Sequence, residues 1–308
     1  MNLKKPKFWD FKEPNLIAYI LLPFAVLLQY LNNFFKRNDP FKFKIKTVCV
    51  GNIYIGGTGK TSLSIQINKI LNKKNIKTCF VKKFYIDQAD EQKLLEKEGK
   101  LFLAKTRFEA IQKAEKENYE FAILDDGLQD PSIKYDFNLV CFNTLNWKGN
   151  GLTIPAGPLR ESINNLKNYN HVFLNGNLEN IDYLKDEIQK INSEIKIHVA
   201  KYEPINLGEV NKNEKYFVFS GIGNHTTFIK MLSNYGLDII ENIEFPDHYN
   251  YKSDDIEKII SKAKKLNSKI LTTKKDYLRL NKKYLEEIKF IEVELKIIDE
   301  NKFIEAIL

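Results

Sequence analysis

The chain has 308 residues, of which 43% are hydrophobic and 29% charged, and its formal net charge is +8. This length allows two domains of ordinary size, and the composition excludes a disordered tail and a multi-span membrane protein. The basic excess is concentrated before residue 47, where nine Lys and Arg stand against three Asp and Glu. The rest is nearly neutral, so nothing indicates nucleic-acid binding. Three widely separated cysteines without a CxxC pair argue against a disulfide scaffold and fit a reducing compartment.

The first 44 residues are predicted to associate with a membrane. Residues 15–31 carry no charge. At about 1.5 Å per residue they would form a helix of roughly 25 Å, which is shorter than the roughly 30 Å hydrocarbon core of a bilayer. Pro23 should kink this helix, and basic residues flank it on both sides. We therefore expect segment 1–44 to lie at the membrane surface rather than to span it. The alternative is an ordinary helix buried in the core.

The next region, residues 45–175, is predicted to form one lobe in which strands alternate with helices. The expected strands are 45–50, 77–81, 121–124, 137–142 and 172–174, and the expected helices are 61–72 and 107–117. Short apolar, β-branched runs bounded by turn residues favour the strands. Because the elements alternate, the strands should be parallel, with ligands bound at their carboxyl ends.

Two further regions complete the chain. Residues 176–214 are less regular, contain one candidate strand at 195–199, and are expected to connect two lobes. Residues 215–308 alternate again and predict a second, smaller α/β lobe. Its expected strands are 216–220, 269–273 and 290–293, and its expected helices are 227–235 and 253–266.

A glycine-rich segment lies between the first strand and the first helix of the 45–175 lobe. It consists of Gly56, Gly57, Thr58, Gly59, Lys60 and Thr61. The backbone N–H groups of such a turn, at the start of a helix, bind phosphate oxygens. Lys60 would neutralise the β- and γ-phosphates, and the Thr61 hydroxyl would bind Mg²⁺. Tyr54 stands where the strict pattern has its first glycine, but strand, glycines, Lys-Thr and helix keep their order. The segment predicts nucleotide binding; the alternative is a fortuitous glycine turn.

Asp125 and Asp126 end the apolar strand 121–124. This is the expected place for an acid that holds Mg²⁺ directly or through water. The alternatives are a helix cap or a simple Asp-Gly turn. The sequence as a whole thus predicts an α/β fold with a P-loop NTPase-like parallel-sheet lobe, a second smaller α/β lobe and an N-terminal membrane-associated helical segment.

Six segments in order resemble one family. They are VGNIYIGGTGKTSL at 50–63, DDGLQ at 125–129, PAGPLRE at 155–161, SGIGN at 220–224, Asp-His at 247–248 and TKKD at 273–276. Together they are similar to the tetraacyldisaccharide 4'-kinases, the lipid A 4'-kinases of Gram-negative bacteria. The phosphate loop alone would be unspecific, but the DDGLQ and PAGPLRE segments make the resemblance specific.

The resemblance implies an activity and a location. The γ-phosphoryl group of ATP, with Mg²⁺, would move to the 4'-hydroxyl of an acylated disaccharide 1-phosphate. The enzyme would work at the cytoplasmic face of the bacterial inner membrane, attached through its N-terminus. The lipid substrate and the membrane surface are the expected partners, and neither nucleic acid nor an obligate protein partner is expected.

The resemblance also suggests roles for individual residues. Lys60 and the backbone of residues 57–61 would hold the triphosphate, while Thr61 with Asp125 or Asp126 would place Mg²⁺. Gln129 would orient a metal-bound water or a phosphate oxygen. Arg160 would stabilise the transferring charge and Glu161 would bind metal, unless the two form only a surface salt bridge.

The acceptor hydroxyl needs a base or an orienting carboxylate. The family takes this group from a Gly-Asp-Glu-Pro segment, to which Ala89-Asp90-Glu91-Gln92 corresponds here. Asp90 is therefore the candidate base. His248 is its candidate partner, although a single histidine is more often structural.

The sequence departs from the family in three places. A Ser-Arg-Gly-Tyr-Gly stretch after the second strand is replaced by VKKFY at 81–85, Asp130 stands in a histidine position, and His225 stands where proline is common. Lys82 and Lys83 are candidates to replace the missing arginine charge. These departures leave two alternatives open: an ATP-binding membrane-associated switch or scaffold, and a P-loop kinase with a different, soluble acceptor.

Overall fold

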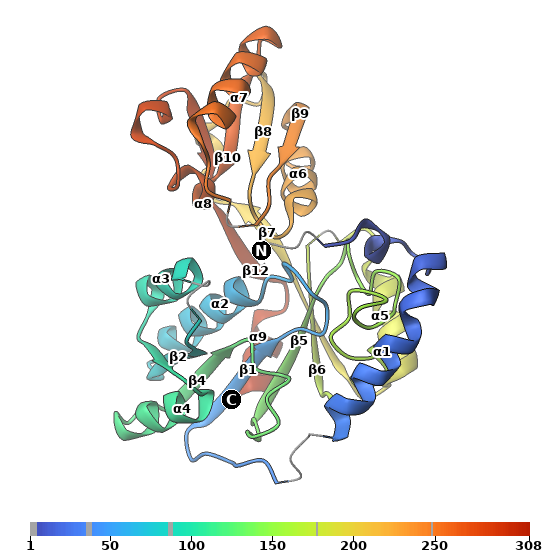
Figure 1. Ribbon diagram of the computed structural model, residues 1–308. Helices are drawn as coiled ribbons and strands as arrows, with labels where there is room; N and C mark the ends of the chain where they lie inside the picture. The colour runs from blue at the N-terminus through green and yellow to red at the C-terminus, as the bar shows by residue number, and fades with distance from the viewer. Residues whose placement is uncertain (1–4, 35–38, 86–88, 177, 248) are drawn as a thin grey trace. The chain divides into compact units, whose positions relative to one another are not determined.

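The computed structural model describes residues 5–34, 39–85, 89–176, 178–247 and 249–308 (Figure 1), without the side chains of residues 32–34 and 89–90. The chain divides into two compact units. Unit 1 comprises Met1–Ala200 and Ile297–Leu308, and unit 2 comprises Lys201–Lys296. The mixed α/β fold class, with one large parallel sheet and a second smaller sheet, is confirmed.

Unit 1 contains most of the larger sheet, whose eight strands run in the order β12-β7-β6-β5-β1-β4-β2-β3; the end of β7 and all of β12 except Ile297 belong to unit 2. The strands are β1 Lys46–Gly51, β2 Thr78–Lys83, β3 Leu101–Ala104, β4 Phe121–Asp125, β5 Phe137–Asn143, β6 His171–Asn175, β7 Lys196–Pro204 and β12 Val293–Ile297. From β7 to β3, neighbouring strands are all parallel. Strands of a parallel sheet are buried on both faces, and β1 is buried at every position after its first residue.

Two of the described helices of unit 1 precede β1 in sequence, α9 follows β12, and the others lie between strands. The helices are η1 Lys7–Asp10, α1 Leu16–Phe34, α2 Lys60–Lys73, α3 Ala89–Glu98, α4 Arg107–Lys116, η3 Ile163–Asn168, α5 Ile181–Ile191 and α9 Glu300–Ile307. One apolar cluster joins α4 to β1, β2 and β4, and another joins α5 to β5 and β6. Because β1 lies between β4 and β5, residues that follow β1 and β4 reach the same edge of the sheet.

Helix α1 is continuous through Pro23, and its apolar side chains are largely exposed. Leu16 is 76% exposed, Ile20 62% and Phe24 60%. This exposure contradicts the alternative of a helix buried in the core. Among the described residues, no helix combines the length and the hydropathy that crossing a membrane requires.

Unit 2 has a four-stranded parallel sheet in the order β11-β10-β8-β9. Its elements are η4 Leu207–Glu209, β8 Lys215–Ser220, α6 His225–Asn234, β9 Asp238–Glu244, α7 Ser253–Lys265, β10 Lys269–Thr273, α8 Lys274–Tyr277, η5 Lys282–Tyr284 and β11 Ile288–Ile291. A buried cluster from β8, α7 and β10 forms part of its core.

The division into units falls at other positions than the segments 1–44, 45–175, 176–214 and 215–308 expected from the sequence. Residues 176–200 belong to unit 1 because α5 shares an apolar cluster with η3 and because β7 pairs with β6 in the sheet. The C-terminus returns to unit 1, where Phe303 of α9 contacts the rings of Phe173 and His198. These contacts join residues more than 100 positions apart, which a reading in chain order does not reveal.

Candidate nucleotide-binding site

The glycine-rich turn joins β1 to α2 as the sequence predicts. Gly56 and Gly59 have φ values of 123° and 78°, in the region that favours glycine. Gly59 is the N-cap of α2 and provides no side-chain cap, so the first N–H groups of the helix are free of capping side chains. Lys60 and Thr61 form the first positions of α2. A turn of this kind at a helix N-terminus is a site for phosphate oxygens.

Neighbouring segments hold the turn in place. Asn175, at the end of β6, donates from Nδ2 to the Thr58 carbonyl at 2.6 Å. The Ile55 N–H donates to the Pro158 carbonyl at 2.8 Å, and the Arg160 N–H donates to the Ile53 carbonyl at 2.6 Å. The PAGPLRE segment at 155–161 is therefore hydrogen-bonded to the loop that precedes the glycines.

Tyr54, the departure from the strict phosphate-loop pattern, is only 1% exposed. Its hydroxyl donates to Asp10 Oδ1 at 2.7 Å and accepts a hydrogen bond from Lys5 Nζ at 2.9 Å. Burial and the bond to Asp10 raise the pKa of the Tyr54 hydroxyl. The tyrosine thus ties the start of the loop to the N-terminal segment, and Gly56 and Gly59 after it have positive φ values.

Asp125 lies beside Thr61 at the end of β4. The Thr61 hydroxyl donates to Asp125 Oδ2 at 3.1 Å, and Lys82 Nζ donates to the same oxygen at 2.8 Å. Lys82 also pairs with Glu91 Oε2 at 2.5 Å. Burial alone would lower the pKa of the Lys82 ammonium, but the charges of Asp125 and Glu91 outweigh it and raise the pKa.

The donor set at Asp125 suits Mg²⁺. Asp125 Oδ1 is buried and has no hydrogen-bond partner among the described residues, so one hard oxygen is left for a cation or its water. The described part of the chain contains no group of three or more Asp, Glu, His or Cys side chains that could hold a metal. Mg²⁺ in phosphoryl-transfer sites normally takes only one or two protein ligands and completes its shell with phosphate and water. The Thr61–Asp125 pair fits that pattern.

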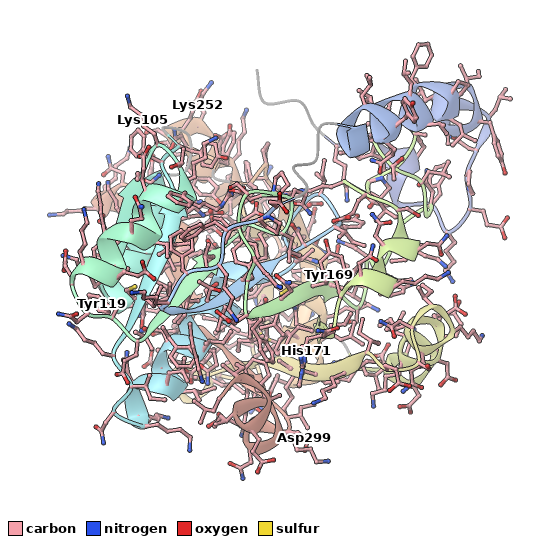
Figure 2. All side chains as sticks on the ribbon, turned by 90° about the horizontal axis from the view of Figure 1, so that it is seen from below. Lys105, Tyr119, Tyr169, His171, Lys252 and Asp299 are labelled. Carbon is pink, nitrogen blue, oxygen red and sulfur yellow. The ribbon has the colours of Figure 1, made fainter. Side chains whose placement is uncertain are left out.

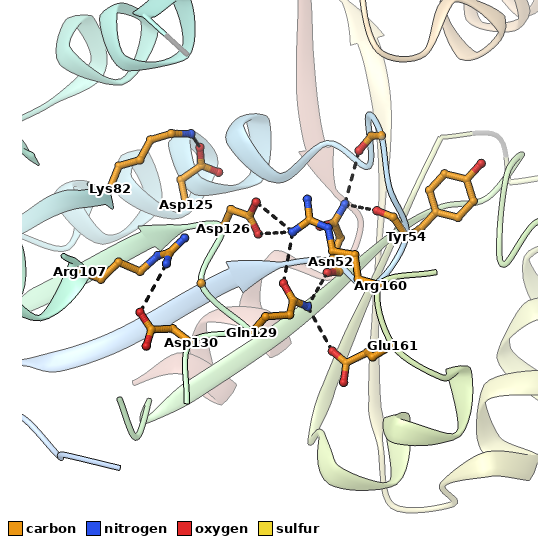
Figure 3. A network of polar contacts seen from close by, with 12 residues as sticks. Asn52, Tyr54, Lys82, Arg107, Asp125, Asp126, Gln129, Asp130, Arg160 and Glu161 are labelled. Atoms are coloured by element: carbon orange, nitrogen blue, oxygen red, sulfur yellow. Dashed lines mark hydrogen bonds and ion pairs between the residues drawn. The ribbon is translucent and has the colours of Figure 1, made fainter. Parts of the chain in front are cut away.

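Asp126 lies in a second network, with Arg160 at its centre (Figure 3). Arg160 Nη1 donates to Asp126 Oδ1 at 3.1 Å and to Gln129 Oε1 at 3.2 Å. Burial would raise the pKa of the Asp126 carboxyl, but the charges of Lys60, Arg160 and Arg107 hold it below its usual value. Asp126 has φ of 66°, which turns the chain sharply at the end of β4. Lys60 and Arg160 thus both place positive charge near Asp126.

Gln129 and Glu161 are held by neighbouring residues. Gln129 Nε2 donates to the Asn52 carbonyl at 3.0 Å and to Glu161 Oε1 at 3.2 Å. Glu161 also accepts from Asn165 Nδ2 at 2.7 Å and from the Tyr169 hydroxyl at 2.9 Å. Both carboxylate oxygens of Glu161 are therefore already hydrogen-bonded, and metal binding by Glu161 would need one of these bonds to open.

The structure thus brings most of the expected site residues to the carboxyl ends of the strands in the sheet of unit 1. Thr61 meets Asp125, while Asp126, Arg160, Gln129 and Glu161 form the neighbouring network. The backbone of Asp90 is in the first turn of α3, but its side chain is outside the described residues, and so is His248.

Sequence reasoning missed two residues of the site. Asn175 was not singled out, although its position at the carboxyl end of a buried strand was a signal. Glu91 follows the candidate base directly and was not assigned a role, because its bond to Lys82 joins two elements whose distance in space the sequence does not give.

A parallel sheet, a glycine turn at a helix N-terminus and an adjacent Thr–Asp pair define a P-loop nucleotide-binding protein of the phosphotransfer type. A family model described as tetraacyldisaccharide-1-P 4'-kinase matches residues 17–308. The chain belongs to this family, whose members are ATP-dependent kinases of lipid A biosynthesis. The resemblance stated from the sequence motifs is confirmed.

Relatives support this assignment. A tetraacyldisaccharide 4'-kinase of Pelagibacter ubique is 55% identical over 300 residues, which cover 97% of this chain and 96% of the relative. One from Rickettsia akari is 34% identical and covers 91% of this chain and 90% of its own length. A crystal structure of LpxK from Aquifex aeolicus in complex with ATP has a TM-score of 0.66 at 23% identity, covering 95% of this chain and 99% of that chain, which shows a shared fold.

Proposed function

We propose that this chain transfers the γ-phosphoryl group of ATP to the 4'-hydroxyl of a tetraacyldisaccharide 1-phosphate, using the carboxyl edge of the unit 1 sheet. The observation that carries the proposal is the N-terminus of α2, which has no side-chain cap from Gly59, together with the adjacent pair of half-buried Thr61 and buried Asp125. In the reaction the acceptor oxygen bonds to the γ-phosphorus, the bond to the bridging oxygen of ADP breaks, and the hydroxyl proton passes to a base.

Positive charge is supplied to the phosphates from two directions. Lys60 and the N–H groups of residues 57–61 would hold the β- and γ-phosphates. Arg160 is the second cation and would move from Asp126 toward the charge that develops during transfer. Gln129 accepts from Arg160 and donates to Asn52, so it fixes the guanidinium relative to the loop.

Thr61 and Asp125 would hold Mg²⁺, the unpartnered Asp125 Oδ1 facing the ion or its water. When bound, the ion neutralises phosphate charge and orients the γ-phosphoryl group. Asp126 would contribute through Arg160 and Lys60, and Glu161 would keep Gln129 in place. We retain Asp90 as the proposed base and His248 as its proposed partner on the strength of their matching segments in the sequence.

A lipid acceptor has to be met at a bilayer, and α1 offers a surface for that contact. Large apolar side chains of α1 are exposed, whereas two small residues, Ala18 and Ala25, are buried. The exposed residues include Leu16, Ile17, Tyr19, Ile20, Phe24, Val26 and Leu27. Gln29 also donates to the Arg160 carbonyl at 2.9 Å, which links α1 to the PAGPLRE segment. We propose that α1 lies in the surface of the inner membrane on its cytoplasmic side.

The catalytic proposal is tested with the full chain, radiolabelled ATP, Mg²⁺ and tetraacyldisaccharide 1-phosphate in detergent micelles. Labelled bisphosphorylated lipid is expected, and it should be lost in Lys60→Ala. ATP binding without labelled lipid would instead favour the switch or scaffold. Transfer to a water-soluble acceptor would favour a different kinase.

The membrane proposal is tested by sedimentation with vesicles that contain anionic lipid. Ile20→Glu/Phe24→Glu should weaken vesicle binding at least tenfold, because each exposed apolar side chain contributes about 1.5–3 kcal/mol when buried. A matched control is Ile205→Glu/Leu278→Glu, which changes two residues of unit 2 that are 57% and 66% exposed. Equal vesicle binding by the two double variants would contradict a membrane role for α1.

A further inference from the structure

A buried lysine is bonded to the carboxylate proposed to hold the metal. Lys82 is the last residue but one of β2, and its side chain is only 3% exposed. Its Nζ lies 2.8 Å from Asp125 Oδ2, and the Asp125 side chain is 1% exposed. The second partner of Lys82 is Glu91, which is 31% exposed. An ammonium buried this deeply between two carboxylates is a fixed charge rather than a loose surface contact.

Two arginines of this edge pair with other carboxylates, and Lys60 places its charge near Asp126. Arg160 is paired with Asp126 at 3.1 Å, and Arg107 is paired with Asp130 at 3.4 Å. Lys82 forms an ion pair with Asp125 at 2.8 Å. It binds the same carboxylate oxygen that accepts the Thr61 hydroxyl, so it lies beside the proposed metal site.

A divalent cation at this position would meet the ammonium at close range. Mg²⁺ and the Lys82 Nζ would share one carboxylate in a site with little solvent to screen their repulsion. The triphosphate of ATP supplies the negative charge that offsets this repulsion. Without nucleotide, the site should therefore discriminate against the metal.

We propose that Lys82 is an internal counter-ion of Asp125, which keeps divalent metal out of the nucleotide-free site and makes metal binding depend on ATP. The inference rests on the proposed function in that Thr61 and Asp125 form the metal site. It adds that metal and nucleotide bind together because the chain carries its own cation in place of the metal when ATP is absent.

The test measures Mn²⁺ binding to the nucleotide-free full chain by electron paramagnetic resonance. We expect weak binding by the wild type and at least tenfold tighter binding by Lys82→Met, which removes the charge and keeps a similar length. The thermal midpoint of Lys82→Met should also rise on adding Mn²⁺, since the metal replaces the missing charge, whereas that of the wild type should not. Lys83→Met is the matched control on the same strand and should bind Mn²⁺ like the wild type.

The result that overturns the proposal is equal Mn²⁺ affinity in Lys82→Met and the wild type. Because removing a buried charge can unfold the chain, Lys82→Gln serves as a second variant that keeps a hydrogen-bond donor. If both variants are unfolded without metal, Mn²⁺ should restore their far-ultraviolet circular dichroism, and failure to do so also overturns the proposal. The readout needs no lipid: tighter Mn²⁺ binding without lipid phosphorylation would remove only the proposed acceptor. Lipid phosphorylation with unchanged Mn²⁺ binding would remove only the role of Lys82.

Discussion

Each unit contains a glycine turn between a parallel strand and a helix, but the polar groups around the two turns are arranged in opposite ways. In unit 1 the turn joins β1 to α2, and in unit 2 residues 221–223 join β8 to α6. Near the first turn, Asp125 Oδ1 and Thr58 Oγ1 are buried without a hydrogen-bond partner among the described residues. Buried polar atoms left in this way are costly unless a ligand binds them.

Around the second turn, both oxygens of the nearby aspartate are hydrogen-bonded within the protein, although Asn224 Nδ2 is buried without a partner among the described residues. Asp276 is 0% exposed and accepts from the Gly221 N–H at 3.1 Å, the Thr273 hydroxyl at 2.7 Å and the Tyr251 hydroxyl at 2.9 Å. The SGIGN and TKKD segments therefore meet in a closed network.

His225, which stands where the family commonly has proline, makes further hydrogen bonds beside this network. Its Nδ1 lies 2.7 Å from Ser220 Oγ and its Nε2 lies 2.9 Å from Asn242 Oδ1. Because Asn242 Oδ1 can only accept, Nε2 donates to it. The comparison teaches that a strand-turn-helix with a nearby aspartate marks a ligand site where a carboxylate oxygen of that aspartate remains free, as Asp125 Oδ1 does and the Asp276 oxygens do not.

The largest effect is expected from Lys60→Ala in the open turn. Lipid phosphorylation should fall by about 10²–10³-fold, because a cation that stabilises the transferring phosphate is lost. Stability should change by less than about 0.5 kcal/mol, as for other changes outside the core. The checks are the radiolabelled lipid assay and a urea titration. Lys73→Ala, exposed at the far end of α2, is the control and should leave both unchanged.

The next prediction concerns Tyr54, where a substitution should change the stability of the protein but not its affinity for ATP. Tyr54→Gly restores the strict pattern but empties a buried site, so it should lower the free energy of unfolding by about 3–5 kcal/mol. ATP affinity of the folded variant should stay within about threefold, and isothermal calorimetry measures it. Tyr54→Phe keeps the ring and should cost only about 1 kcal/mol. A marked gain in ATP affinity for Tyr54→Gly would show that the tyrosine obstructs the loop.

Asp276→Asn tests the closed network of unit 2. The amide would turn one N–H donor toward hydroxyl or N–H donors that now bond the carboxylate, so we expect a loss of about 1–3 kcal/mol in stability. ATP binding should be unchanged, as measured by the same calorimetry. Loss of ATP binding with normal stability would mean that the unit 2 turn is a ligand site, and the comparison would fail.

The smallest effect concerns the opposite edge of unit 1, where His171 begins β6 (Figure 2). His171 Nδ1 lies 3.0 Å from His198 Nε2. Burial lowers the pKa of both to about 4; for His171 the charge of His198 adds to this. The unfolded chain takes up protons near pH 6.5 and the folded chain only near pH 4, so stability should fall as the pH drops through that window.

The expected loss between pH 6.5 and pH 4.5 is on the order of 1–2 kcal/mol, since His198 remains partly exposed to solvent. Urea titrations at several pH values measure it. His171→Gln/His198→Gln should show a flatter pH dependence in this window. An unchanged slope in the double variant would assign the loss to carboxylates instead.

Several elements of the fold could not be predicted from the sequence, for physical reasons that the structure identifies. Strand β3 has only four residues, too few for a clear pattern, and was not predicted. In β9, the exposed residues of DIIENIE alternate with half-buried ones, so no apolar run marks the strand. The region 176–214 was expected to be less regular apart from a strand at 195–199, which corresponds to β7, and its helix α5 was not predicted.

The candidate site was predictable to a similar degree. Lys60 and Thr61 could be assigned because they follow a glycine turn and begin a helix, and Asp125 and Asp126 because they stand at the end of a strand. The roles of Arg160, Glu161 and Gln129 came from the resemblance. The hydrogen bonds of Glu161 to Asn165 and Tyr169 favour a supporting role over the expected metal role.

The sequence by itself determined the local elements of this protein: the strand, glycine turn and helix at residues 46–73, and the acidic end of β4. These depend on periodicity, on positive φ values and on side chains that are neighbours in the chain. Only the tertiary structure decided which charges meet. Lys82 reaches Asp125 across 43 positions because β2 lies beside β4, and Arg160 reaches Asp126 because its segment bonds to the phosphate loop. Strand order is a property of the whole packed sheet, and no local pattern specifies it.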